Sequence, residues 1–258
     1  MASRETEASE SRRGAVSGAG IGLGLLSLAA ASALFGAAAT ADVLTLEATR
    51  DNTLFEDAQG DTSSGSGPTL FAGRNSQGLV RRALVSFDVR SALPHGTVVD
   101  SVTLHLHLSS SSDPSPRAIR VHRVLADWGE GASSSAGGSG APAQDGDATW
   151  LHTFYPGTFW ASRGGDFTST PSASMTVVGE GDYAWRSPEL TADVQAWLAA
   201  GAEHGWIMIG EETVPGTARR FDSREHPTPE QRPWLALHYS MVTPAEPHTW
   251  GGLRHRYR

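Results

Sequence analysis

Apolar and polar side chains alternate strictly over residues 102–108, and this pattern constrains the fold more than any other feature of the sequence. Val102, Leu104, Leu106 and Leu108 fall on one side of the alternation, and Thr103, His105 and His107 fall on the other. Successive side chains of a β-strand point to opposite faces of its sheet. The pattern therefore predicts a strand with one face in a hydrophobic core.

Most of the remaining chain repeats this design in shorter pieces. Turn-forming Gly, Pro and Ser residues separate further strand-like segments at 43–48, 69–72, 81–89, 119–125, 174–178, 183–186, 205–210 and 233–240. The period changes at Leu190, Val194, Trp197 and Leu198, which recur at helical spacing between Pro188 and Gly201. Many short strands with one short helix predict an all-β, antiparallel β-sandwich. Residues 131–146 and 149–167 lack periodicity and are predicted as loops, the second of them ordered.

The first 41 residues have the organisation of an export signal. Arg12 and Arg13 precede an apolar stretch at 21–39, and Ala39-Thr40-Ala41 provides a small-x-small cleavage pattern. Cleavage there places the mature start at Asp42 and a secreted, periplasmic or cell-surface location, with no membrane attachment afterwards. An uncleaved anchor is the alternative, because about 19 apolar residues are just enough to span a bilayer.

Composition narrows the classes of partner and chemistry. The formal net charge is −8, which argues against a nucleic-acid ligand. The chain has no cysteine, so thiolate catalysis and cysteine-ligated zinc are excluded. All 20 basic residues are arginine. That bias agrees with recognition of acidic ligands, but a GC-rich genome produces the same bias and is the explanation that we favour.

Seven strings in order along the chain resemble the DNRLRE domain family. They are residues 51–57 (DNTLFED), 82–88 (RALVSFD), 127–131 (DWGEG), 164–167 (GGDF), 193–197 (DVQAW), 220–225 (RFDSRE) and 232–235 (RPWL). The resemblance implies an exported bacterial sandwich of jelly-roll type, similar to carbohydrate-binding modules for acidic polysaccharides such as alginate. Such domains are often attached to enzymes or anchors, whereas here we expect one domain at 42–240 and a flexible tail at 241–258.

The RFDSRE string is the first candidate for a binding site. In a strand, Arg220, Asp222 and Arg224 share one face, and Glu225 adds a further charge beside them. Arginine forks bind carboxylates with two hydrogen bonds, so these four residues suit a sugar carboxylate. The alternative is an internal network of ion pairs that holds the last strands together.

Tryptophans are the second candidate. Trp128, Trp150 and Trp160 fall in or beside predicted loops, where an exposed ring can stack on a sugar. Packing beneath a loop is the alternative for each. The remaining tryptophans lie in segments with apolar periodicity, and we expect them in the core. They are Trp185, Trp197, Trp206 and Trp234.

Metal binding has two candidate residue sets. Asp51 and Asp57 lie in an acidic stretch that supplies hard oxygen ligands for structural calcium, although EF-hand spacing is missing. A solvated acidic loop is the alternative. His105, His107 and His122 have a spacing compatible with zinc, but solvent-facing histidines explain them as well.

Hydrolase signatures are missing from the sequence, which has no G-x-S-x-G, no H-E-x-x-H and no phosphate-binding loop. The leading hypothesis is therefore a non-catalytic, secreted module that binds an acidic polysaccharide or a cell-surface or matrix component. A structural or adhesive surface protein without a small ligand is one alternative. A polysaccharide-degrading enzyme is the other, since paired carboxylates cannot be located from sequence alone.

Overall fold

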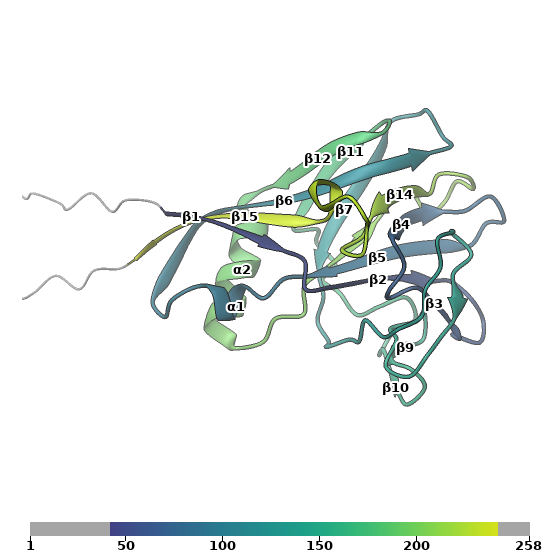
Figure 1. Ribbon diagram of the computed structural model, residues 1–258, viewed down its shortest axis with the longest axis horizontal. Coiled ribbons are helices and arrows are strands. Elements are labelled where there is room, and N and C mark those ends of the chain that lie inside the picture. Colours follow the sequence, from purple (N-terminus) through teal and green to yellow (C-terminus); the bar gives the residue numbers. More distant parts are fainter. Residues whose placement is uncertain (1–41, 242–258) are drawn as a thin grey trace, which may run out of the picture. The chain divides into compact units, whose positions relative to one another are not determined.

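The computed structural model describes residues 42–241 (Figure 1). All strand pairs within this range are antiparallel. Eleven strands form one sheet that curls over into two layers, which confirms the prediction of an all-β sandwich with one short helix. The export signal at 1–41 and the tail beyond Met241 lie outside the described residues.

The first layer is built around β6 (Thr97–Ser111), the longest strand. β15 (Trp234–Met241) pairs along the first part of one edge of β6, and β1 (Asp42–Glu47) pairs with β15. Beyond β15, β14 (Arg219–Asp222) pairs with the last residues of β6. β12 (Gly181–Arg186) also pairs with β6, over residues 103–108.

The second layer has the strand order β2–β5–β13–β7–β11. Its members are β2 (Arg50–Phe55), β5 (Val80–Ser86), β13 (Trp206–Ile209), β7 (Arg117–Arg123) and β11 (Ala173–Val177).

β4 (Thr69–Arg74) joins the two layers, because it pairs with β14 over 69–72 and with β5 at Gly73 and Arg74. Gly73 marks this change of partner. Its φ is +121°, and a Cβ there would lie 2.9 Å from the Cα of Ala218. A side chain at this position would prevent the close crossing of the two backbones.

The main hydrophobic core lies between the layers and follows the alternation of the strands. Val102, Leu104, Leu106 and Leu108 of β6 are all within 2% of full burial, as the sequence pattern predicts. From the second layer come the alternate residues of β5 and β13, namely Ala83, Val85, Trp206 and Met208.

A second hydrophobic core covers the opposite face of β5 and β13. Leu84, Ile207 and Ile209 point to this side, and the long segment 125–167 packs over them. This segment includes β8 (Ala141–Pro142), β9 (His152–Phe154) and β10 (Thr158–Phe159), and β8 pairs with β3 (Thr62–Ser63). The central strands of the second layer are therefore buried on both faces, which explains the uninterrupted apolar sequence of β13.

The predicted helix is α2 (Pro188–Ala200). Ser187 caps its N-terminus by accepting the N–H of Leu190 at 2.9 Å, and Gly201 ends it with a φ of 75°. Two polar side chains of α2, Thr191 and Gln195, accept N–H groups along the edge of β6 that β12 leaves uncovered. The helix therefore covers this part of the β6 edge and packs its apolar face against the main core.

Two short turns complete the described elements. α1 (Val89–Ala92) is a single turn that the sequence analysis does not predict, and η1 (Pro229–Gln231) precedes β15. Among residues 42–241, no helix has both the length and the apolar character needed to cross a membrane.

Candidate functional site

The structure divides the predicted RFDSRE cluster into two separate places. Phe221 points into the main core, so Arg220 and Asp222 share the outer face of β14, as the alternation predicts. The strand ends at Asp222, and Arg224 and Glu225 lie in the turn that follows. Arg220 therefore faces a pocket on the outside of the first layer, whereas Arg224 and Glu225 meet a group of carboxylates.

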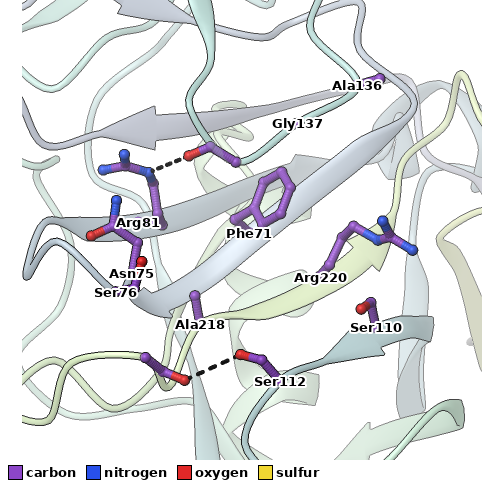
Figure 2. Close-up of a pocket in the computed structure, with 12 residues that line it drawn as sticks. Phe71, Asn75, Ser76, Arg81, Ser110, Ser112, Ala136, Gly137, Ala218 and Arg220 are labelled. Carbon is purple, nitrogen blue, oxygen red and sulfur yellow. Dashed lines mark hydrogen bonds between the residues drawn. The ribbon is translucent and has the colours of Figure 1, made fainter.

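The pocket has a volume of about 280 Å³ and lies over β4, β14 and the end of β6 (Figure 2). Its rim on one side is the segment 136–138. Side chains of several chemical kinds line it, including Phe71, Asn75, Arg81, Ser110, Ser112 and Arg220. Figure 2 shows the ring of Phe71 between Arg81 and Arg220.

Phe71 is held on this outer face by its neighbours in β4. Leu70 and Ala72 are fully buried in the main core, so the ring of Phe71 points away from that core and stays half-buried. The N–H of Phe71 donates to Thr53 Oγ1 at 3.1 Å, and its ring packs 6.4 Å from that of Phe55. The phenyl ring is thus a fixed apolar surface at the pocket.

The two arginines of the pocket differ in how far they are buried and in their hydrogen-bond partners. Arg81 is only 4% exposed, and its guanidinium donates to the carbonyls of Gly138 and Val80. Arg220 is half-buried and donates only to Ser109, at 3.2 Å to the hydroxyl and 3.3 Å to the carbonyl. Within residues 42–241, Arg220 forms no ion pair with a carboxylate. Its positive charge is therefore available to a ligand.

Asp222, unlike Arg220, is not accessible to a ligand. It is 1% exposed, and Nε2 of His226 lies 3.6 Å from its Oδ1. This placement favours a structural role over contact with a ligand.

The second place is a carboxylate cluster formed by Asp51, Glu130 and Glu225. One carboxylate oxygen from each residue lies within 4.8 Å of the other two. The N–H of Asp51 donates to Glu130 Oε1 at 2.8 Å, and the N–H of Arg224 donates to Asp51 Oδ2 at 2.7 Å. Arg224 Nη1 lies 3.0 Å from Glu130 Oε2 and 2.5 Å from Glu225 Oε1. Arg224 thus takes part in a network of ion pairs, the alternative that the sequence analysis left open for it.

Burial shifts the titration of this cluster. Asp51 is fully buried, and its burial, with the nearby charge of Glu225, raises the pKa of its carboxyl well above the usual range. Desolvation also raises the pKa values of Glu130 and Glu225. Burial therefore makes the ionised forms of these three carboxyls costly unless a positive charge lies beside them, and Arg224 is the cation that pairs with Glu130 and Glu225.

Asp57 does not join Asp51. Its Oδ1 accepts the N–H of Gly60 in a tight turn, and among the described residues the only group with metal-ligand spacing is Asp51, Glu130 and Glu225. The pairing of Asp51 with Asp57 expected from sequence is therefore corrected, because adjacency in the chain does not bring the two carboxylates together.

The three loop tryptophans do not offer exposed rings. Trp128, Trp150 and Trp160 are 0%, 8% and 6% exposed, and all three belong to the second core. The indole N–H of Trp128 donates to the carbonyl of His204, and that of Trp160 donates to the carbonyl of Thr149. A ring buried in this way cannot stack on a sugar, so the structure supports packing beneath the loop.

Trp234 was expected in the core, and the structure places it outside the core. Trp185, Trp197 and Trp206 belong to the main core as expected, but Trp234 is half-buried outside it and stacks on His105 with ring centres 3.6 Å apart. The histidines expected as a zinc alternative are not gathered. His107 pairs with Asp182 in the first layer, whereas His122 lies on β7 in the second layer and donates from Nδ1 to the carbonyl of Thr168.

Several residues of these sites were not singled out from sequence, Phe71 and Glu130 among them. Phe71 follows the same alternation as its strand and could have been assigned outward from the apolar residues on either side. Glu130 belongs to the DWGEG string, but nothing local to that string indicates its distant carboxylate partners.

Comparison of the chain with models of known protein families gives no match, and a search of curated proteins finds no relative.

Proposed function

We propose that this protein is a non-catalytic binding module for an acidic polysaccharide, which it recognises in the pocket around Phe71 and Arg220. The single observation that carries the proposal is the half-buried guanidinium of Arg220, which has no carboxylate partner within residues 42–241 and lies in the same pocket as a fixed phenyl ring. A charged donor beside an apolar ring is the pair of features that a uronate sugar requires.

Each part of the pocket corresponds to a part of such a sugar. The flat, apolar face of a sugar ring packs on an aromatic side chain, here Phe71. The uronate carboxylate accepts charge-assisted hydrogen bonds from Arg220. Hydroxyl and amide groups of Ser110, Ser112 and Asn75 line the same space and suit sugar hydroxyls.

Size and charge support the same ligand class. The volume of about 280 Å³ lies at the lower end of small-molecule pockets, so the pocket suits one sugar unit of a longer chain. The whole protein carries a formal charge of −8. A polyanion therefore needs a locally positive site, and Arg81 and Arg220 provide it. The resemblance to DNRLRE domains, and the export that the first 41 residues predict, agree with an extracellular polysaccharide.

The proposal is tested by calorimetric titration of the full chain with alginate fragments, polygalacturonate and neutral dextran. We expect binding to at least one of the two polyuronates and none to dextran. Loss of the hydrogen bonds from Arg220 to a carboxylate is worth about 1.5–3 kcal/mol, so Arg220→Gln should weaken binding by about 10- to 100-fold. The melting temperature should change little, because the side chain of Arg220 forms hydrogen bonds only with Ser109 among the described residues.

Arg186→Gln is the matched control, since Arg186 is an exposed arginine on β12 of the same layer. It should bind as the unaltered protein does. No binding to any polyuronate by the folded protein would contradict the proposal and favour an adhesive role. Release of new reducing ends during incubation would instead show a degrading enzyme.

A further inference from the structure

We propose that Asp51, Glu130 and Glu225 form a calcium-binding site that joins three segments of the chain. The segments are strand β2, the loop that follows β7, and the turn after β14. The site is separate from the polysaccharide pocket, and the proposal does not depend on the function proposed above.

The geometry supplies the first argument. Three carboxylate oxygens, one from each residue, lie within 4.8 Å of one another. Calcium takes six to eight oxygen ligands at about 2.3–2.6 Å, so oxygens on opposite sides of the ion are about 4.6–5.2 Å apart. The three carboxylates can therefore reach one ion with little movement, each supplying one oxygen.

An unsatisfied atom supplies the second, independent argument. Asp51 is 0% exposed, and its Oδ1 is buried without a hydrogen-bond partner among the described residues. The other oxygen, Oδ2, accepts the N–H of Arg224, so the side chain is held in place and directed into the cluster. Asp57 Oδ2 and Asp222 Oδ2 are also buried without a partner, but of these three residues only Asp51 belongs to a group with metal-ligand spacing within the described range. A buried polar atom without a partner calls for a group to satisfy it, and at Asp51 a cation bound in the cluster does so.

The local charges supply the third argument. Three carboxylates meet one guanidinium, that of Arg224, which leaves two negative charges when all are ionised. Arg50 also approaches Glu130, but it is paired with Asp127 at 2.8 Å. Burial and the neighbouring Glu225 raise the pKa of Asp51, as expected where carboxylates gather without a metal. One divalent cation balances the remaining charge.

The chemistry of the ligands selects calcium over other common ions. All three ligands are hard oxygen donors, which zinc and other softer metals do not prefer. Magnesium demands a nearly ideal octahedron at about 2.0–2.1 Å, whereas calcium tolerates irregular geometry. Glu130 and Glu225 are half-buried, so water can complete the coordination from their side.

The test uses the full chain after treatment with EDTA, titrated with calcium chloride by calorimetry and followed by thermal unfolding. We expect one calcium per chain. At a calcium concentration of a hundred times Kd, the melting temperature should rise by about 5–10 °C. Magnesium chloride at matched ionic strength should raise it far less. Absence of calcium binding by the EDTA-treated, folded protein would overturn the proposal.

Asp51→Asn separates a metal site from a merely structural network. The substitution keeps the size and the acceptor for Arg224 but removes one negative charge. The metal-free variant should melt at or above the temperature of the metal-free unaltered protein, and its calcium response should be lost. If Asp51→Asn does not fold, Glu225→Gln answers the same question at a half-buried position.

Glu212→Gln is the matched control, because Glu212 is also half-buried and paired with one arginine, Arg82. It should keep the full calcium response. Unchanged calcium affinity in Asp51→Asn or Glu225→Gln would place the ion elsewhere and overturn the assignment. Polyuronate titrations repeated in EDTA keep this result distinct from the test of the polysaccharide pocket.

Discussion

At the scale of single residues, charged side chains of the same type differ in burial and therefore in the interactions that they form. Arg219 is fully buried and donates to the carbonyl of Ser115, while its neighbour Arg220 faces an open pocket. Asp51 is fully buried in one layer, whereas Asp57 sits half-buried in a turn. In each case residues of the same type take opposite roles, because alternation and loop geometry give them different surroundings.

The effect of burial on the charge of Glu203 can be tested by measuring stability as a function of pH. It lies beside α1, where the N–H of Val89 donates to its Oε2 at 3.1 Å. Desolvation is the largest influence and raises the pKa of Glu203 from 4.5 to about 7, with Asp88 adding to the shift and Arg50 opposing it. The folded state therefore holds the proton more tightly than the unfolded chain does. This contribution to stability is complete below about pH 4.5 and is lost as the pH rises through 7.

Glu203→Gln should remove this dependence, because the amide is neutral at every pH. Urea unfolding at pH 5 and pH 8 should show the variant more stable than the unaltered protein at pH 8, by about 1–3 kcal/mol, and nearly equal at pH 5. The exposed residue Glu180 supplies the control as Glu180→Gln, which should follow the unaltered protein. Parallel pH dependence for Glu203→Gln and the unaltered protein would contradict the argument.

At the scale of elements, α2 shows how local and long-range interactions combine. Leu190, Val194 and Trp197 bury one face of the helix in the main core, and Ser187 satisfies an N–H at its start. Ser187 also donates to the carbonyl of Ser172. The capping side chain therefore also connects the start of α2 to the segment before β11.

Ser187→Ala should lower the free energy of unfolding by about 1–2 kcal/mol, because the N–H of Leu190 loses its acceptor. Chemical denaturation measures this change directly. Ser91→Ala, at an exposed serine of α1, should change it by less than about 0.5 kcal/mol. Equal effects from the two substitutions would mean that the cap contributes nothing specific.

At the scale of the whole described region, two hydrophobic cores lie on opposite faces of the second layer. The main core is closed by the first layer and α2, and the second core is closed by the segment 125–167. That segment contains few regular elements, so its stability depends on buried aromatic anchors such as Trp128, which is 0% exposed. The covering segment should therefore open before the sandwich unfolds.

Trp128→Ala should reduce the free energy of unfolding by about 3–5 kcal/mol and expose the covering segment to protease. Limited proteolysis with mapped cleavage sites should place the first cuts within 125–167. Phe159→Ala provides the comparison in the same segment, because Phe159 is 60% exposed and should lose little stability. First cuts elsewhere in the variant would show that the segment does not open separately.

The sequence by itself determined the class of fold and the inward faces of its elements. Leu104 and Leu106 could be placed in a core, and α2 could be bounded at Gly201, because side-chain direction and helix caps follow from backbone geometry over a few residues. The same local logic placed Arg220 opposite Phe221.

Only the tertiary structure decided which residues meet. Asp51 and Glu130 are 79 positions apart, and their contact depends on the order in which strands pair and on the path of the covering segment. The burial of Trp128 and the half-exposed position of Trp234 have the same cause, because distant chain segments decide whether a loop or a strand face is covered. Local periodicity carries no information about such long-range packing, so the pocket and the carboxylate cluster could be located only in three dimensions.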